Sequence, residues 1–372
     1  MLLERPVYKI PDFVVQIPEE RNPIVLQLTD PQIIDATQQR YGERLGGLYT
    51  QYLPENMDTR CFEYMRQTIK AVNPDLIILT GDLVYGEFDD KGTSFTKFVE
   101  FMDSFGIPWA PVMGNHEAES TRGVDWQCDV LTNSACCLFD RKGLTGNGNY
   151  SVGIVQGGKL IRVFYMVDSN GTGASSQSLA NGHTKTSAGF GQDQIDWYTD
   201  EITAIHTLSP DTKISFAFHI QMAAFADAYA KYGFTNAGTA NNPINIDLLK
   251  NKEDGDFGYL GWDLKGVWDT DKTVFTGLKA LGVDSIFIGH EHCNSASVVW
   301  EGIRFQFGQK SSTYDRYNYV DMASGAVVGS YDDGGIPLVG GTVIPLCAGT
   351  GEIVDPYIFL CKNADGNIDR DR

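Results

Sequence analysis

Residues that can bind metal ions recur along the sequence, each directly after a short apolar run. They are Asp30 in LTDPQ, Asp82 in LTGDLVYGE, Asn115 and His116 in GNHE, His219 in FAFHI, and His290 and His292 in GHEH. Carboxylate, amide and imidazole groups together suit divalent or trivalent first-row metals, whereas ligands made only of oxygen would suit magnesium or calcium. The pattern therefore predicts a metal centre whose ligands are held at rigid strand ends.

The apolar runs before these residues predict buried β-strands. They are short and rich in β-branched or aromatic residues, and they comprise residues 24–28, 76–79, 109–113, 163–167, 214–218 and 285–288. Between them, apolar residues recur at helical spacing, for example at Phe62, Met65, Ile69 and Val72. Strands that alternate with helices indicate an α/β fold. Because ligands bind beyond the carboxyl ends of strands in such folds, the candidate ligands can converge on one crevice.

We expect one domain over residues 1–372, with a core from about residue 22 to 310 and a C-terminal β extension over residues 311–372. No repeat or linker divides the chain, and the segment VVWEGIRFQFG after His292 predicts a β-hairpin. Residues 169–192 and 233–262 lack periodicity, and loops of this length are candidates for covers of a substrate site.

The charge of the chain restricts its partners. The sequence has 48 acidic and 29 basic residues and a formal net charge of −19. Such a field repels nucleic acids and anionic membranes, so we expect neither as a partner. A small or protein-borne phosphate ester can still bind, because bound cations reverse the local field. The sequence does not define an oligomeric state.

The sequence also restricts the compartment. No apolar stretch approaches the ~20 residues that a transmembrane helix needs. The N-terminal segment carries Glu4, Arg5 and Lys9 and has no continuous apolar stretch typical of a signal peptide. On the chain as given we expect a cytoplasmic protein, or an exported one if a signal peptide has been removed.

The order of the motifs resembles that of the calcineurin-like metallophosphoesterases over residues 24–307. D-x-Q, GDxxY, GNHE, H and GHxH each follow a predicted strand. Within that superfamily the chain is most similar to the purple acid phosphatase-like branch, on the strength of GDLVY, GNHE, GNGNY, VDSNG, QDQIDWY and GHEH. The resemblance implies an α/β fold made of a two-sheet β-sandwich flanked by helices, with two metals at the sheet edge.

The resemblance also implies how the ligands are shared. The first metal would be held by Asp30 and His292, and Asp82 would bridge both metals. The second metal would be held by Asn115, His219 and His290. The expected cofactors are two divalent or mixed-valence ions of manganese, iron or zinc.

His116 and Asp82 are the expected catalytic residues. By resemblance, His116 would stand beside the leaving group, oriented by a nearby carboxylate, while a metal-bound hydroxide attacks phosphorus in line. We therefore expect a phosphoric ester hydrolase, and in particular a phosphomonoesterase. The alternatives are a phosphodiesterase or nucleotide pyrophosphatase, or a metal-binding scaffold without catalysis.

Three residues need separate interpretation. The first motif is D-P-Q where D-x-H is usual, so we interpret Gln32 as a substitute ligand, the alternative being a hydrogen bond to a metal-bound water. Lying two residues after Asp30 on one strand tip, Gln32 should point to the same side. Tyr85 could bind the first metal as a ferric phenolate, but we expect it nearby and unbound. Glu117 is expected to orient His116 or a metal ligand.

Overall fold

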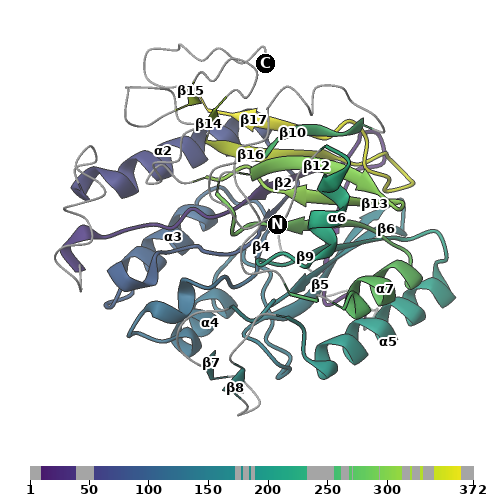
Figure 1. The fold of residues 1–372 in the computed structure, drawn as a ribbon, viewed down its shortest axis with the longest axis horizontal. Coiled ribbons are helices and arrows are strands. Elements are labelled where there is room, and N and C mark those ends of the chain that lie inside the picture. Colours follow the sequence, from purple (N-terminus) through teal and green to yellow (C-terminus); the bar gives the residue numbers. More distant parts are fainter. Residues whose placement is uncertain are drawn as a thin grey trace.

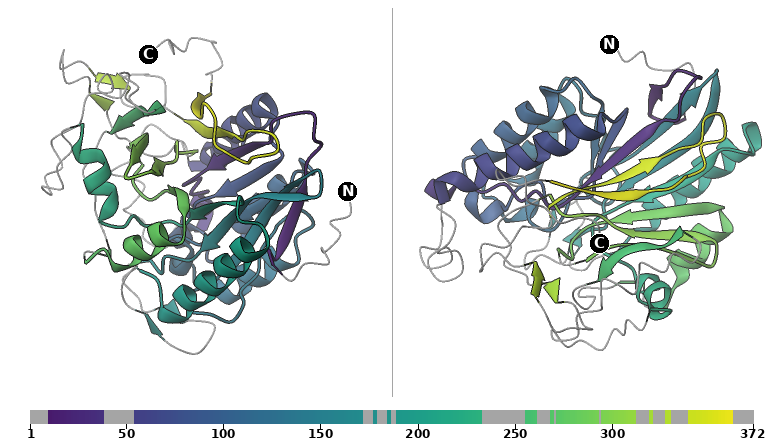
Figure 2. Two further views of the ribbon diagram at one scale, coloured as in Figure 1. Left: turned by 90° about the vertical axis from the view of Figure 1, so that its right-hand side faces the viewer. Right: turned by 90° about the horizontal axis from the view of Figure 1, so that it is seen from above.

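The computed structural model describes most of the chain, and its fold is a two-sheet sandwich with helices on both outer faces (Figure 1). The described residues are 10–38, 54–171, 177–178, 184–185, 189–232, 255–260, 268–269, 271–292, 294–311, 319–320, 327–329 and 339–361. In the second view of Figure 2, the blue helices lie on one side of the sheets and the long teal helix lies on the other. The predicted α/β sandwich is therefore confirmed.

The smaller sheet contains the first three strands that the apolar runs predict. Its order is β17 (Tyr357–Leu360), β16 (Gly340–Pro345), β2 (Ile24–Leu28), β3 (Leu76–Leu79) and β4 (Trp109–Pro111). Strands β2, β3 and β4 are parallel, whereas β16 runs antiparallel to both β2 and β17. Helices α2 (Pro54–Val72) and α3 (Thr93–Asp103) connect the parallel strands.

The larger sheet has eight strands. Its order is β1 (Phe13–Gln16), β5 (Asn149–Gln156), β6 (Lys159–Val167), β9 (Lys213–Ala217), β11 (Val283–Ile288), β13 (Ile303–Phe307), β12 (Asn294–Trp300) and β10 (Phe257–Leu260). Strands β6, β9, β11 and β13 are parallel, and β12 pairs antiparallel with β13 as the predicted hairpin. The helices that accompany this sheet are α5 (Gln192–Leu208), α6 (Ala224–Ala230) and α7 (Thr273–Ala280).

The remaining described elements are short. They are α4 (Val124–Thr132), the 3-10 helices η1 (Ala36–Gln38), η2 (Gly86–Phe88) and η3 (Glu117–Glu119), and the strand pairs β7 (Gln177–Ser178) with β8 (Thr184–Lys185) and β14 (Tyr319–Val320) with β15 (Val327–Gly329). Among the described residues, no helix combines the length and apolar character that crossing a membrane requires.

Strand β6 shows how one strand serves two hydrophobic cores. Phe164 and Met166 pack with residues of the smaller sheet, whereas Val163, Tyr165 and Val167 pack in the cluster that contains the apolar residues of α5, α6 and α7. Successive side chains of a strand point to opposite faces, so the part of β6 between the two cores, residues 163–167, is apolar at every position. Each such side chain, when fully buried, contributes about 1.5–3 kcal/mol. The two cores fix the sheets, and with them the strand ends.

The predicted domain limits stay a prediction, although β16 and β17 extend the sheet of β2 antiparallel to it. The aperiodic segments 169–192 and 233–262 lie largely outside the described residues, so their expected role as covers also stays a prediction.

Candidate metal centre

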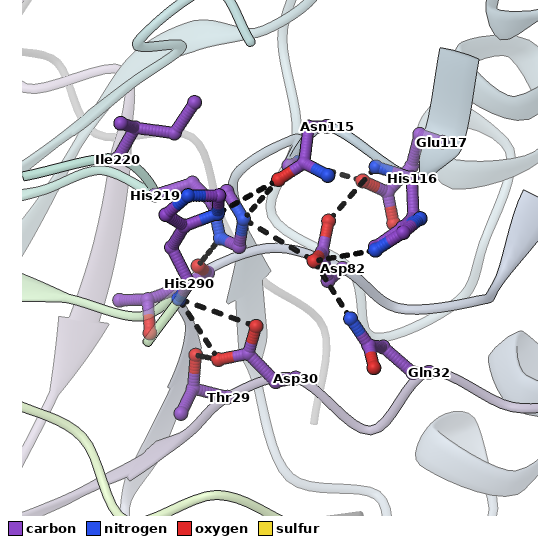
Figure 3. Close-up of polar contacts among 12 residues, drawn as sticks. Thr29, Asp30, Gln32, Asp82, Asn115, His116, Glu117, His219, Ile220 and His290 are labelled. Carbon is purple, nitrogen blue, oxygen red and sulfur yellow. Dashed lines mark hydrogen bonds and ion pairs between the residues drawn. The ribbon is translucent and has the colours of Figure 1, made fainter. Parts of the chain in front are cut away.

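The predicted ligands come together beyond the carboxyl ends of five strands (Figure 3). The loops after β2, β3, β4, β9 and β11 supply, in that order, Asp30 with Gln32, Asp82, Asn115, His219, and His290 with His292. Asp30 and Asp82 are each only 1% exposed. Two buried carboxylates at one sheet edge need compensating positive charge.

The side chains form two ligand groups that share Asp82. Asp30, Asp82 and His292 make one group, and Asp82, His219 and His290 make the other, with the donor atoms of each group within 4.8 Å of one another. Asn115 joins the second group, because its Oδ1 atom lies 3.0 Å from His219 Nε2 and 2.9 Å from His290 Nδ1. A carboxylate common to two groups is the arrangement that can bridge two ions.

The donor atoms are oriented for metal binding. His219 Nδ1 lies 2.7 Å from the carbonyl oxygen of Thr80, which fixes the ring with Nε2 toward the centre. Gln32 Nε2 lies 2.9 Å from Asp82 Oδ2, while the buried Oε1 atom of Gln32 has no hydrogen-bond partner. A half-turn of this amide would exchange its oxygen and nitrogen and direct the unpartnered oxygen at the centre. The donors therefore fit a pair of metal ions.

The charged side chains of the centre shift one another's pKa values. Burial alone would raise the pKa of Asp82, but the positive charges of His219 and His116 hold it well below its ordinary value. Burial lowers the pKa of His219, yet the Asp82 carboxylate outweighs this and raises it to about 9. Burial and the neighbouring His219 lower the pKa of His290 to about 3. The Asp82 carboxylate and the imidazoles around it thus shift one another's pKa values in the directions that their charges require.

The carboxylate that orients His116 is Glu119. Its Oε2 atom lies 2.7 Å from His116 Nδ1, while His116 Nε2 lies 3.8 Å from Asp82 Oδ2. Burial lowers the pKa of His116, but Asp82 and Glu119 together raise it above its ordinary value. Sequence reasoning missed Glu119, although its spacing of three residues in a 3-10 turn brings the two side chains together.

The Glu117 carboxylate is directed at two backbone N–H groups rather than at the His116 ring. It accepts hydrogen bonds from the backbone N–H groups of Leu83 and Gly114. Glu117 therefore ties the loop that follows Asp82 to the loop that carries Asn115. Burial, and then the charge of Asp82, raise the pKa of Glu117 to about 7. Of the two expected roles, the geometry favours orientation of metal ligands.

The ring of Tyr85 stacks on the imidazole of His116, with centroids 4.1 Å apart and planes inclined by 30°. Tyr85 also makes an edge contact with Phe88 in the following 3-10 helix. This places Tyr85 beside the catalytic candidate. Whether Tyr85 binds a metal stays a prediction.

Strand alternation does not orient Gln32, contrary to the expectation from sequence. Asp30 and Gln32 have φ angles of 49° and 43°, so the chain there is left-handed and the two-residue period of a strand does not apply. The Gln32 side chain nonetheless reaches the centre, 3.2 Å from His292 Nε2.

Glycines in the motifs allow the loops to approach one another. A Cβ atom on Gly114 would overlap the Asp82 carboxylate, and one on Gly289 would come within 2.7 Å of Asp30 Oδ2. The glycine of each motif therefore leaves room for the ligand of another motif, which is a use of glycine at close backbone approach.

The chain is similar to known proteins in sequence and in fold. The sequence profile described as calcineurin-like phosphoesterase matches residues 25–294. The chain is similar to the Arabidopsis thaliana protein named "Probable inactive purple acid phosphatase 29", with 25% identity over 268 residues that cover 66% of this chain. It is also similar to "Phosphatase DCR2" of Saccharomyces cerevisiae, with 24% identity over 251 residues, or 64% of this chain.

These matches span 61% of the Arabidopsis protein and 39% of the yeast protein, less than two thirds of either. Among solved structures, a dimetal phosphatase from Danio rerio aligns with a TM-score of 0.51 at 12% identity, covering 88% of this chain and 93% of that one. At this identity the structural likeness concerns the fold alone.

Proposed function

The chain belongs to the calcineurin-like phosphoesterase family, and from this premise we propose that it is a metal-dependent hydrolase of phosphate esters, specifically a phosphomonoesterase. The single observation that carries the proposal is the pair of ligand groups that share Asp82. The side chains in these groups are of the types and at the separations that two first-row metal ions need.

We assign the ligands to two positions. Asp30, Gln32 and His292 would hold one ion, and Asn115, His219 and His290 would hold the other. Asp82 would contact both. When bound, ions of manganese, iron or zinc would supply positive charge that polarises the phosphate ester and lowers the pKa of water.

His116 is the proposed general acid. Glu119 holds Nδ1, which leaves Nε2 on the side of the ring that faces Asp82. From there Nε2 can donate its proton to the oxygen of the departing alcohol. The stacked Tyr85 ring restricts rotation of the imidazole and covers one of its faces.

The name of the Arabidopsis relative includes the word inactive, so an inactive scaffold is the alternative to consider. The two ligand groups and the His116–Glu119 pair support catalysis instead. A protein that only binds metal does not need a proton donor beside the centre. The yeast relative is named a phosphatase, which supports the monoester assignment.

The test is hydrolysis of p-nitrophenyl phosphate and bis(p-nitrophenyl) phosphate by protein reconstituted with manganese, iron or zinc. We expect faster turnover of the monoester and none by the Asp82→Asn variant. Faster turnover of the diester would assign the protein to the phosphodiesterases instead. Absence of turnover with every metal, in a folded protein that binds two ions, would favour the scaffold.

A further inference from the structure

Three sequence motifs outside the ligand set meet in one buried hydrogen-bond network. GNGNY supplies Asn149, VDSNG supplies Asp168 and Asn170, and QDQIDWY supplies Gln194. All four side chains are at most 1% exposed. Burial of so many polar groups is unfavourable unless each is hydrogen-bonded, so the arrangement at this point of the fold is specific.

Gln194, in the first turn of α5, is the centre of the network. Its Nε2 atom donates to Asn149 Oδ1 at 2.7 Å and to the carbonyl oxygen of Asp168 at 2.8 Å. Its Oε1 atom accepts from Gly191 N at 2.6 Å and from Asn170 Nδ2 at 3.1 Å. Both donors and both acceptor positions of this amide are therefore used.

The network holds the turn that follows β6. The Asp168 carboxylate accepts from the backbone N–H groups of Asn147 and Asn170, each at 2.7 Å. Asn170 itself has a φ angle of 55°, and its side chain also donates to the carbonyl oxygen of Gly189. A left-handed asparagine whose amide nitrogen donates to both Gly189 and Gln194 is held in position.

The turn touches two ligands of one metal position. Ser169 Oγ accepts a hydrogen bond of 3.0 Å from the backbone N–H of Ile220, the residue after His219. Gly171 packs against Asn115, since a Cβ atom on Gly171 would lie 2.9 Å from both Cα and Cβ of Asn115. The contacts therefore reach His219 through its neighbour in the chain and Asn115 directly.

We propose that this network, made of Asn149, Asp168–Gly171 and Gln194, positions the metal ligands Asn115 and His219 and thereby sets the affinity of the second metal position alone. The inference rests on the proposed function, because it requires two metal positions. The first position depends on Asp30, Gln32 and His292, which are held instead by the loops after β2 and β11. A substitution in the network should therefore weaken metal binding at the second position and leave the affinity of the first position unchanged.

The experiment is calorimetric titration of metal-free protein with manganese ions. Ser169→Ala removes only the acceptor for Ile220, and Gly171→Ala pushes a methyl group against Asn115. Each variant should weaken one binding event by about 10–100-fold, the usual effect of an outer partner of a ligand, and leave the other unchanged. Electron paramagnetic resonance should show uncoupled manganese where the wild type shows a coupled pair.

Two matched variants serve as controls. Ser151→Ala removes a buried hydroxyl that contacts Asp12 and Glu201, and Gly277→Ala adds a methyl group where no atom lies within 4 Å. Both should bind two ions as the wild type does. Unfolding curves in the presence of chelator verify that all variants fold, and Ser169→Ala carries the test if Gly171→Ala does not.

The outcomes separate the two proposals. Wild-type protein that does not bind two manganese ions contradicts the proposed metal centre. Wild-type protein that binds two ions, with Ser169→Ala and Gly171→Ala binding both as tightly or losing both equally, contradicts only the positioning role.

Discussion

The Nδ1 atom of His116 lies 2.7 Å from the Oε2 atom of Glu119, three residues later in the chain. This contact fixes the imidazole with its other nitrogen toward the buried Asp82. A carboxylate in this position both orients the ring and favours its protonated form, which is the form that a proton donor needs.

Removing the proton donor should affect substrates unequally. A general acid contributes about 10²–10⁴-fold, so we expect His116→Ala to lower kcat by such a factor for alkyl phosphates and by less for activated aryl phosphates. Comparison of kcat between the two substrates, with the metal content measured in parallel, checks this. Equal losses would assign His116 to positioning.

Glu119 should act through His116. We expect Glu119→Gln to retain its metals and to lower kcat less than His116→Ala does, since the ring remains but loses its charged partner. The double variant should be no slower than His116→Ala alone, because residues in direct contact are not additive. If the losses in kcat of the two single variants add up in the double variant, Glu119 has a role that is separate from His116.

A methyl group on Gly114 should displace the shared carboxylate. Since a Cβ atom there would overlap Asp82, we expect Gly114→Ala to lose metal affinity by at least the ~10–100-fold typical of outer-shell changes. Gly277→Ala, in the open on α7, is the control and should bind metal normally. Wild-type affinity in Gly114→Ala would mean that the loops after β3 and β4 are not held as described.

Metal removal should lower stability only where the centre is intact. A ligand that is present at 100 times its Kd stabilises the native state by about 2.7 kcal/mol, so chelator should lower the Tm of the wild type. Asp82→Asn should show no such response and no turnover. The control Asp125→Asn changes an exposed carboxylate paired with Arg141, and it should respond to chelator as the wild type does.

Tyr85→Phe tests whether Tyr85 is a ligand. Because phenylalanine keeps the ring that stacks on His116, we expect unchanged metal content and little change in kcat. The iron-loaded wild type should show no visible charge-transfer band that this substitution removes. A violet protein bleached by Tyr85→Phe would identify Tyr85 as a phenolate ligand and leave Gln32 without its proposed role.

Most strands, and the side chains that meet beyond their carboxyl ends, could be predicted from sequence because they depend on local pattern. Strands β2 and β3 span the predicted residues, since both are buried on both faces and apolar at every position except Gln27. Strand β4 ends at Pro111, two residues early, and lies at the edge of its sheet, where proline is tolerated.

The contact of Glu119 with His116 and the direction of the Gln32 side chain could not be predicted in the same way. Glu119 reaches His116 through a single 3-10 turn, which is too short to show a pattern of apolar residues in the sequence. Gln32 lies in a left-handed loop, and its direction depends on backbone angles rather than on strand alternation. Such loops take their conformation from contacts between distant parts of the chain.

Asp30, Asp82 and His290 have φ angles of 49°, 54° and 75°. A non-glycine residue in such a region costs on the order of 1–3 kcal/mol, a cost that glycine avoids. Selection for thermal stability alone should therefore favour glycine at these three positions, and glycine there would remove three of the proposed metal ligands. The acidic and imidazole side chains at these positions therefore cost folding free energy, and the proposed metal centre gives a reason for that cost.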